Sequence, residues 1–452
     1  MTLAVPLSPV PDPFSTAVRF SESSHLLFLD SSAQGSLGRY SFVAADPVAV
    51  ARGLDEARAL LKSHQRPSLP GLPPFQGGIA GYIGYDWGAD LERVKRPPAD
   101  RFTPQVPDVA LALYDWVIAW DHLEEKAWIV STGRGTAAAA RLRWVQERLT
   151  VPPRAIADLA ASAAQPQSNF TRHEYETAVT RIRAYIAAGD VYQVNLAQRF
   201  HAAFAGSPLA LYRRLRARNP APFGAYLDFA GLAIASISPE RFLRLDAGTR
   251  LVEARPIKGT RPRGATPDRD AALARELVTS EKDRAENVMI VDLLRNDLGK
   301  VCRTGSITVT KLLALESHPT VHHLVSTITG TLANRADAFD LLRAAFPGGS
   351  VTGAPKIRAM EIIAELERAP RGVYCGAIGY ISAGGAMDMN IPIRTIVLRD
   401  GTATFHAGAG IVWDSEPAAE YQETLAKART IIEALTSLRR TPRIHGRAHP
   451  PA

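Results

Sequence analysis

Cysteine and long apolar runs are scarce in this chain of 452 residues. Its two cysteines, Cys302 and Cys375, are too few for a disulfide framework and lack the CxxC spacing of zinc or redox sites. No apolar run reaches the roughly 18 to 20 residues that span a bilayer. The N-terminus has acidic and proline residues where a signal peptide has a basic region and an apolar core. We therefore expect a cytoplasmic protein that has no membrane partner.

Positive charge is in excess. The chain has 53 basic and 45 acidic residues, a net charge of +8, which raises the question of nucleic-acid binding. The arginines, however, are scattered along expected helices and in the tail at residues 439–452, without an aromatic-interleaved basic patch or a helix-turn-helix signature. We expect a solvated surface, a disordered tail and no nucleic-acid partner. A basic protein that binds nucleic acid or another anion stays open as the non-enzymatic alternative.

The order of the expected elements indicates an α+β fold. Short β-rich runs make residues 1–151 a mainly β N-terminal half. Residues 152–169, rich in Ala, Pro, Ser and Gln, are a candidate linker. In residues 170–438, helices and strands follow one another without steady βαβ alternation, and 439–452 form the basic tail.

Some segments predict particular local structures. Thr171, followed by Glu174, is a capping box that opens an amphipathic helix. We expect one helix over residues 268–292 and one strand over residues 391–398. The glycines of residues 77–86 are too many for a regular strand interior, and they indicate bulges or close backbone approach.

Two pairs of carboxylates have i, i+3 spacing: Asp283 with Glu286, and Glu420 with Glu423. On a helix this spacing puts both carboxylates on one face, where they repel unless a cation lies between them. Two such helices facing each other would offer up to four carboxylates to a hard ion such as Mg²⁺. Each pair alone also fits a solvated helix face.

Glycine-rich segments and isolated cations are candidates for anion binding. Residues 348–356 bring a proline to the first turn of an expected helix, whose N-terminus has free N–H groups, and the hydroxyl of Thr352 favours an anion site over a plain loop cap. The glycines of residues 405–412 allow a ligand to approach the backbone, although a tight turn explains them too. Arg394 and Lys427 are candidates to hold carboxylates, or are surface charges.

Lys258 lies between an apolar residue and a glycine, at an expected strand end. A lysine is normally a hydrated point charge, but partial burial lowers its pKa and gives an amine that can attack carbon. On this fragment alone, a surface lysine in a turn is the alternative.

Together these segments occur in the order found in the chorismate-utilising enzymes, which the chain resembles strongly over residues 170–435 and weakly before them. The segments are residues 193–199, 238–240, 256–263, 282–297, 322–326, 348–356, 393–395, 408–412 and 420–427. The resemblance implies a composite β-sandwich core flanked by helices, with the active site in a central cleft. This agrees with the α+β prediction.

Two positions divide the family by nucleophile. Members that add water have a lysine base where this chain has Gln193, so the chain resembles members that add ammonia. Anthranilate synthases have alanine where this chain has Lys258. In aminodeoxychorismate synthases this lysine attacks C2 of chorismate and displaces the C4 hydroxyl. The resemblance is therefore to the enzymes that make 4-amino-4-deoxychorismate for p-aminobenzoate and folate, with anthranilate synthase component I as the alternative.

The resemblance also implies roles for other side chains. Glu240 would be the general acid that protonates the departing hydroxyl, and His323 and Thr352 would line the reacting ring. The implied Mg²⁺ ligands are Glu286 and Glu423 directly, and Asp283 and Glu420 through water. The residues implied to bind substrate are Gln193, Tyr380, Arg394, Gly408, Ala409, Gly410 and Lys427.

Two signatures are missing from the chain. It has no Gly-x-Cys-x-Gly nucleophile elbow of a glutaminase, so we expect ammonia to come from solution or from a separate glutamine amidotransferase subunit. Residues 26–32 lack the Leu-Leu-Glu-Ser signature with which anthranilate synthases bind inhibitory tryptophan. The expected partners are therefore chorismate, ammonia and the amidotransferase subunit.

Overall fold

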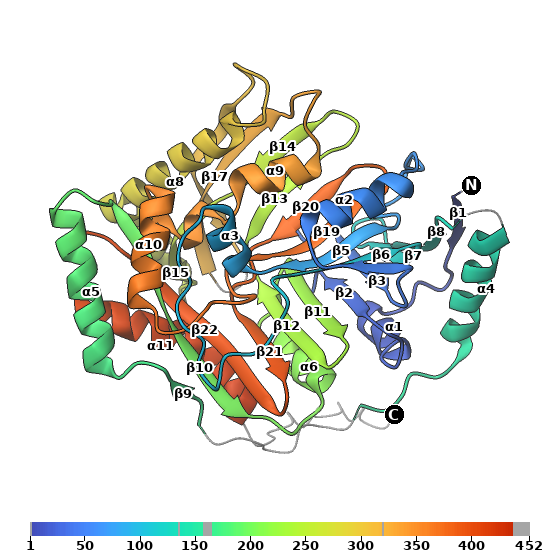
Figure 1. Cartoon of the computed structure of the whole chain (residues 1–452), viewed down its shortest axis with the longest axis horizontal. Coiled ribbons are helices and arrows are strands. Elements are labelled where there is room, and N and C mark those ends of the chain that lie inside the picture. The colour runs from blue at the N-terminus through green and yellow to red at the C-terminus, as the bar shows by residue number, and fades with distance from the viewer. Residues whose placement is uncertain (1, 134–135, 157–164, 319–320, 437–452) are drawn as a thin grey trace, which may run out of the picture.

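The computed structural model describes residues 2–133, 136–156, 165–318 and 321–436. Two large antiparallel sheets pack face to face, and helices cover their outer faces (Figure 1). The α+β prediction, with a sandwich core flanked by helices, is confirmed. The expected tail and the centre of the expected linker lie outside the described residues. Within the described ranges, no helix is both long and apolar enough to cross a bilayer.

The larger sheet has 12 strands and combines early, middle and late segments of the chain, because β2 pairs with β11 and β12 pairs with β21. Along the sheet the strands are β1 (Leu3–Pro6), β8 (Lys126–Ser131), β7 (Trp116–Asp121), β3 (Tyr40–Ala44), β2 (Leu26–Asp30), β11 (Phe223–Phe229), β12 (Leu232–Ser238), β21 (Thr395–Arg399), β22 (Thr402–Ile411), β10 (Gln193–Ala203) and β18 (Gly353–Ala354), and β9 (Gln167–Ser168) pairs with β10.

The second sheet has 10 strands and also mixes early and late segments. Its strands are β15 (Ile257–Pro262), β17 (Val321–Thr331), β14 (Leu251–Ala254), β13 (Arg241–Leu245), β20 (Met387–Asn390), β19 (Ala377–Ser382), β5 (Gly78–Ile83), β6 (Val109–Tyr114) and β4 (Ala49–Ala51), and β16 (Thr308–Ser317) pairs with β17. The close approach expected at residues 77–86 is confirmed, since a Cβ atom at Gly81 would lie 2.1 Å from the Ala110 carbonyl oxygen. The glycines nevertheless form the regular strand β5.

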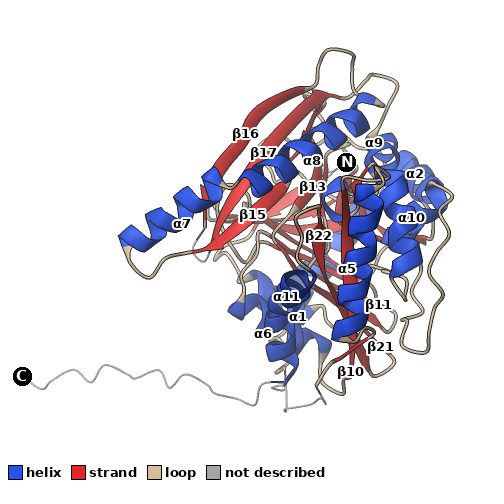
Figure 2. Ribbon diagram, turned by 90° about the vertical axis from the view of Figure 1, so that its left-hand side faces the viewer, coloured by secondary structure: helices blue, strands red, loops and turns tan. Residues whose placement is uncertain are grey.

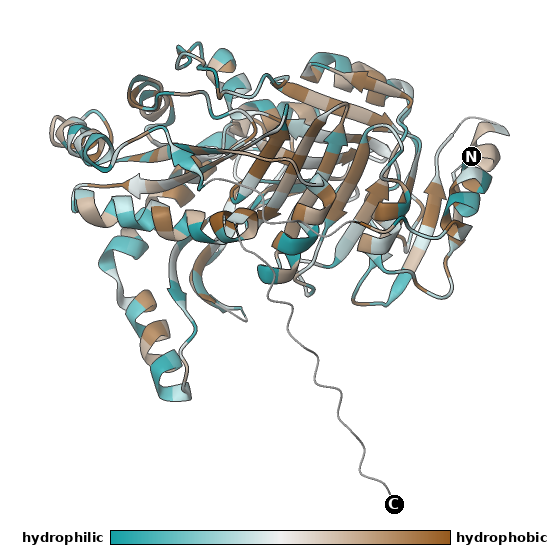
Figure 3. Cartoon of the chain, turned by 90° about the horizontal axis from the view of Figure 1, so that it is seen from below, coloured by the Kyte–Doolittle hydropathy of each residue, from teal (hydrophilic) through white to brown (hydrophobic). Residues whose placement is uncertain are grey.

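Helices form the outer layers. They are α1 (Pro13–Arg19), α2 (Leu54–Ser63), α3 (Tyr85–Leu91), α4 (Thr136–Thr150), α5 (Arg172–Ala187), α6 (Pro208–Arg218), α7 (Pro267–Thr279), α8 (Glu281–Gly299), α9 (Ala338–Ala345), α10 (Lys356–Leu366) and α11 (Pro417–Thr436), with a short 3₁₀ turn η1 (Gly349–Val351). Apolar side chains of α1, α6 and α11 pack on the larger sheet, and those of α2, α8 and α9 on the smaller one. Figure 2 shows α7 and α8 lying along β15, β16 and β17. Figure 3 shows apolar residues concentrated in the strands.

Helix α5 confirms the predicted capping box, because Thr171 and Glu174 each accept a hydrogen bond from the other's backbone N–H. The single helix predicted over residues 268–292 is wrong. Ser280 has an extended backbone that ends α7, and its hydroxyl caps α8 by accepting a hydrogen bond from the Asp283 N–H at 3.3 Å. Asp283 therefore lies in the first turn of α8.

The strand predicted over residues 391–398 is only partly right. β21 begins at Thr395, because Arg394 has a left-handed φ of 53° that interrupts the extended run.

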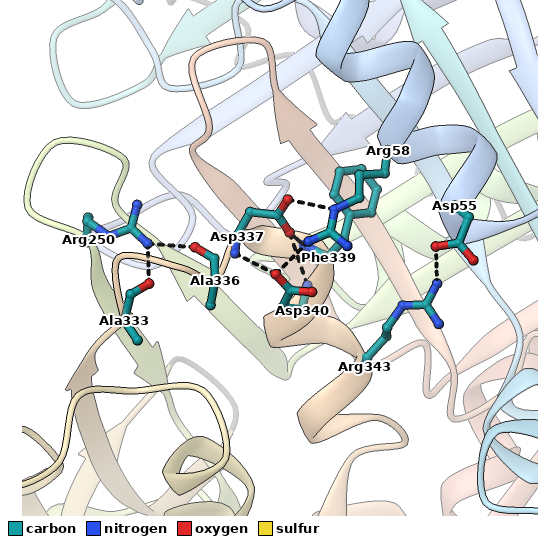
Figure 4. Close-up of polar contacts among 9 residues, drawn as sticks. All are labelled: Asp55, Arg58, Arg250, Ala333, Ala336, Asp337, Phe339, Asp340 and Arg343. Atoms are coloured by element: carbon teal, nitrogen blue, oxygen red, sulfur yellow. Dashed lines mark hydrogen bonds and ion pairs between the residues drawn. The ribbon is translucent and has the colours of Figure 1, made fainter.

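Helix α2, from the N-terminal half, is tied to α9 by ion pairs. The Arg58 guanidinium donates to both Asp337 and Asp340, which also cap the first turn of α9 (Figure 4). Nearby, Arg250 donates to the carbonyls of Ala333 and Ala336.

Among the described residues, the most deeply buried ion pair joins Glu367 and Arg371, which are 4% and 3% exposed. Their closest N···O distance is 2.6 Å. The Arg371 guanidinium also donates to the carbonyls of Val351 at 2.8 Å and Asn195 at 2.7 Å, and Glu367 accepts the Ala197 N–H at 2.8 Å. One pair thus holds β10, η1 and the chain after α10 together.

We expect Arg371→Met to destabilise the fold by about 3–5 kcal/mol, because it leaves the Glu367 carboxylate buried and uncompensated. Denaturant unfolding followed by circular dichroism measures this loss. The matched control is Arg172→Ala, which breaks the exposed pair with Glu176 and should leave the midpoint nearly unchanged. Equal midpoints for the two variants would contradict the structural role of Arg371.

Candidate active site

Lys258 lies in a bulge of β15 that a glycine makes possible. The pairing with β17 shifts register between Ile257 and Thr260, and Gly259 has a left-handed φ of 79°. A Cβ atom at Gly259 would lie 2.9 Å from the Asp283 side chain, so a glycine allows the bulge to pack against α8. The bulge directs Lys258 inward, and its Nζ donates to the Ser350 carbonyl at 2.9 Å.

Ser350 connects Lys258 to Glu240. Its carbonyl accepts from Lys258, and its hydroxyl donates to Glu240 Oε1 at 2.7 Å. Burial lowers the pKa of Lys258, although the charges of Glu286 and Glu240 oppose the shift. Burial raises the pKa of Glu240, against the hydrogen bond from Ser350. Both shifts favour the neutral forms, an amine that is a nucleophile and a carboxylic acid that is a proton donor.

The four carboxylates predicted to bind metal come from α8 and α11 and lie close to one another. Burial raises the pKa of Glu286, and the charges of Asp283 and Glu420 add to this shift. Both Glu286 and Glu423 act on Lys258 by raising its pKa. The helices therefore bring one carboxylate of each pair, Glu286 and Glu423, near Lys258. The role of the four carboxylates as metal ligands stays a prediction.

Three of these carboxylates are paired with cations. The pairs are Lys427 with Glu423 at 2.7 Å, Lys282 with Glu420 at 3.4 Å, and Arg261 with Asp283 at 3.2 Å. Although burial opposes it, Lys427 and Lys282 lower the pKa of Glu423. In the described ranges, no group of three or more His, Cys, Asp or Glu side chains has the geometry of a metal site. The oxygen donors fit the chemistry of Mg²⁺, but binding would require these ion pairs to open.

Gln193 and Gly410 face each other across the end of β10 and β22. A Cβ atom at Gly410 would lie 2.8 Å from Gln193 Nε2 and 3.8 Å from Glu286 Oε2, so the glycine lets these groups approach. Both polar atoms of the Gln193 side chain are buried and without a hydrogen-bond partner in the described part of the chain. Lys427 Nζ donates to the Gly408 carbonyl at 2.9 Å. These four predicted residues are thus assembled beside the carboxylates.

Arg394 is a largely buried cation. Burial lowers its pKa, and among the described residues no carboxylate pairs with its guanidinium. Arg394 also acts on His323, whose pKa is lowered to about 4 by burial and by the charges of His318 and Arg394. Thr260 Oγ1 and His323 Nδ1 share a hydrogen bond of 2.9 Å. A buried guanidinium without a counter-ion is suited to a carboxylate ligand.

Three residues that were predicted to contact the substrate have side chains that contact the protein core or the backbone instead. The Tyr380 ring stacks on Phe75 at 4.7 Å in the core between the sheets. The Thr352 hydroxyl donates to the Gly348 carbonyl at 3.0 Å, and Ala409 packs in the core beneath α5 and α10. Helix α10 begins at Lys356, so the proline expected in its first turn is its N-cap instead. The proposed roles of these residues stay predictions.

Sequence reasoning missed several residues that shape the site. Ser350 lay within a noted segment but was not singled out. Asn287 donates to the Leu324 carbonyl at 3.1 Å and accepts from Ser326, which fixes α8 against β17 and so positions Glu286. The available signal was Asn287 itself, because asparagine is unfavourable inside a helix unless its side chain has a partner.

Comparisons with known proteins identify the family of this chain. A family model described as chorismate binding enzyme matches residues 24–433. Aminodeoxychorismate synthase component 1 of Klebsiella aerogenes is 46% identical over 395 residues, covering 87% of this chain and 84% of that protein. Anthranilate synthase component 1 of Streptomyces coelicolor is 41% identical over 421 residues, covering 89% and 81%.

Among solved structures, anthranilate synthase component I from Streptococcus pneumoniae TIGR4 matches with a TM-score of 0.78 and 35% identity, covering 88% of this chain and 93% of that one. The resemblance expected from the nine sequence segments is confirmed. The chain therefore belongs to the chorismate binding enzyme family and is a chorismate-utilising enzyme.

Proposed function

We propose that the protein is component I of an aminodeoxychorismate synthase, which converts chorismate and ammonia to 4-amino-4-deoxychorismate and water. The observation that carries this proposal is the inward Lys258, whose pKa is lowered by burial, joined through Ser350 to the buried Glu240. The identity of 46% to the aminodeoxychorismate synthase component of Klebsiella aerogenes, against 43% to the anthranilate synthase component of Pseudomonas putida, slightly favours it. Anthranilate synthase, the alternative, must also release pyruvate and has no need of a lysine nucleophile.

In this mechanism Lys258 and Glu240 act in turn. The neutral Lys258 amine forms a bond to C2 of chorismate, both ring double bonds shift by one position towards C4, and the C4 hydroxyl leaves as water with a proton from Glu240. The Glu240 carboxylate recovers that proton from the new secondary amine. Ammonia then attacks C4, both double bonds shift back, and Lys258 leaves as the amine with the proton from Glu240. The new ammonium group at C4 returns a proton to the Glu240 carboxylate.

Charged side chains would orient the chorismate dianion. Arg394 and Lys427 would hold one carboxylate near the backbone of residues 408–410. Mg²⁺, if held by Glu286 and Glu423 directly and by Asp283 and Glu420 through water, would supply positive charge for the other carboxylate. Ammonia would come from a separate glutamine amidotransferase, which the word component in the relatives' names supports.

We expect Lys258→Ala to reduce aminodeoxychorismate formation by about a hundredfold or more, because the covalent route is lost. The assay mixes protein, chorismate, Mg²⁺ and ammonium and separates the products by mass spectrometry. Lys311→Ala, on exposed β16, is the control and should retain full activity. Undiminished product from Lys258→Ala would refute the nucleophile, and anthranilate from the wild type would favour the alternative enzyme.

The rate at constant free ammonia should depend on pH at both ends. Activity needs neutral Lys258 and protonated Glu240, so the rate declines at low pH, where Lys258 gains a proton, and at high pH, where Glu240 loses one. Burial lowers the pKa of Lys258 and raises that of Glu240. The pH values at which the rate declines on the two sides therefore lie closer together than they would for exposed groups. Glu240→Gln should lower kcat/KM by about 10²-fold or more and abolish the decline at high pH. An unchanged profile would exclude Glu240 as the acid.

Chelation with EDTA should stop turnover, and added Mg²⁺ should restore it. Glu286→Gln and Glu423→Gln should each raise the half-saturating Mg²⁺ concentration by about tenfold or more, because each loses a charged oxygen ligand. Glu281→Gln, in the exposed first turn of α8, is the matched control. Metal titrations that coincide for all variants would remove both residues from the ligand set.

A further inference from the structure

A cavity of about 430 Å³ lies between α2, the hairpin of β13 and β14, the start of α9 and the turn between β19 and β20. Much of its lining is apolar and well packed, because five of the side chains are each at most 5% exposed. These are Leu61, Leu245, Leu332, Phe339 and Ile381. A cavity of this size and lining is large enough for a small organic molecule.

Strand β13 separates this cavity from the proposed active site. Glu240 directly precedes the strand, whereas Leu245 is its last residue and lines the cavity. Five residues of extended chain span about 16 Å. Among the described residues that line the cavity, none has a role in the proposed mechanism.

The charged side chains at the cavity are three cations, Arg58, Lys62 and Arg250, and two carboxylates, Asp246 and Asp337, so the net charge of the lining is +1. Arg58 pairs with Asp337 at 2.8 Å. Asp246 accepts hydrogen bonds at 2.8 and 2.7 Å from the backbone N–H and the hydroxyl of the same residue in its own turn. Lys62 and Arg250 are the cations that remain for a ligand.

Neither of these two cations has a carboxylate partner among the described residues. Lys62 lies exposed in the last turn of α2, and its ammonium group makes no hydrogen bond or ion pair there. Arg250 uses Nε and Nη2 to donate to the carbonyls that precede α9, which leaves Nη1 for another acceptor (Figure 4). Two such cations beside an apolar lining suit a carboxylate that has an apolar body.

The backbone at Arg250 is an unusual support for a side chain. Its φ of 59° lies in the left-handed region, at the end of the hairpin turn between β13 and β14, where glycine is the ordinary choice. Strain of this kind concentrates at functional positions. The hairpin thus holds a guanidinium at the cavity where a glycine would relieve the strain.

We propose that this cavity is a second ligand site, for a small carboxylate with an apolar body. The carboxylate lies between Lys62 and Arg250, and the body packs on the five apolar side chains. The proposal goes beyond the proposed function and does not depend on it. Because Lys62 belongs to the N-terminal half and Arg250 to the catalytic region, the ligand ties the two together, as the ion pairs of Arg58 do.

The test uses benzoate as the probe and benzamide as its uncharged analogue of similar shape, with binding measured by saturation-transfer NMR. Lys62→Glu puts a negative charge beside the ligand carboxylate. Lys311→Glu, on exposed β16, makes the same change in net charge and is the matched control. Ala247→Phe fills the cavity and keeps both cations. Arg394→Met removes the unpaired guanidinium of the proposed active site.

We expect the wild type to bind benzoate about tenfold more tightly than benzamide. Lys62→Glu should weaken benzoate about tenfold or more, and Ala247→Phe should abolish its binding, whereas Lys311→Glu and Arg394→Met should bind as the wild type does. Turnover of chorismate with ammonium should stay near wild type in Lys62→Glu and Ala247→Phe, which also shows that both variants fold.

Three results would overturn the second site. The first is a wild type that does not bind benzoate, or that binds benzamide equally well. The second is undiminished binding in Lys62→Glu, which folds whether or not Ala247→Phe does, because Lys62 is exposed. The third is loss of binding in Arg394→Met alone, which would place benzoate in the proposed active site. None of these results bears on the proposed function, which the product assay tests separately.

Discussion

The buried pair of Glu367 and Arg371 is the constraint on which the site depends. Arg371 donates to carbonyls of η1 and β10, and Glu367 accepts an N–H of β10, so the strand and the turn cannot move apart without exposing an unpaired charge. Ser350 lies in η1, and its position sets where both Lys258 and Glu240 form hydrogen bonds. The reacting groups are thus positioned by an ion pair that would take no part in the chemistry.

Charge is distributed unevenly around Lys258. Carboxylates of α8 and α11 act on one another and are mostly paired with cations, whereas Arg394 has no carboxylate partner among the described residues. A dianionic substrate would pair one carboxylate with Arg394, and a metal ion between the carboxylates of the protein and the other carboxylate of the substrate would reduce their repulsion. Burial lowers the pKa of Lys258 and raises that of Glu240, and so favours the neutral form of each. In the proposed mechanism, the neutral amine is the nucleophile and the neutral carboxylic acid is the proton donor.

Local patterns in the sequence predicted much of this. The capping box at Thr171 and the i, i+3 carboxylate pairs follow from short-range geometry, and the structure confirms the box and brings the pairs together. The break at Ser280 was missed because serine is tolerated inside helices, and its capping role depends on the following turn. Glu367 and Arg371 look like a surface i, i+4 pair, and only packing between distant segments buries them. The placement of Tyr380 in the core between the sheets, likewise, depends on β5 and β19 pairing across almost 300 residues of chain.

The most direct test of the account is to look for the bond that Lys258 should form. Protein is mixed with chorismate and Mg²⁺ without ammonia, quenched in acid, digested and mapped by mass spectrometry, and a parallel sample receives ammonium to prove that the enzyme turns over. The account predicts that the peptide containing Lys258 carries chorismate less one water, and that ammonium discharges it. An unmodified Lys258 peptide in an enzyme that turns over, or an adduct on another residue, would contradict the central claim.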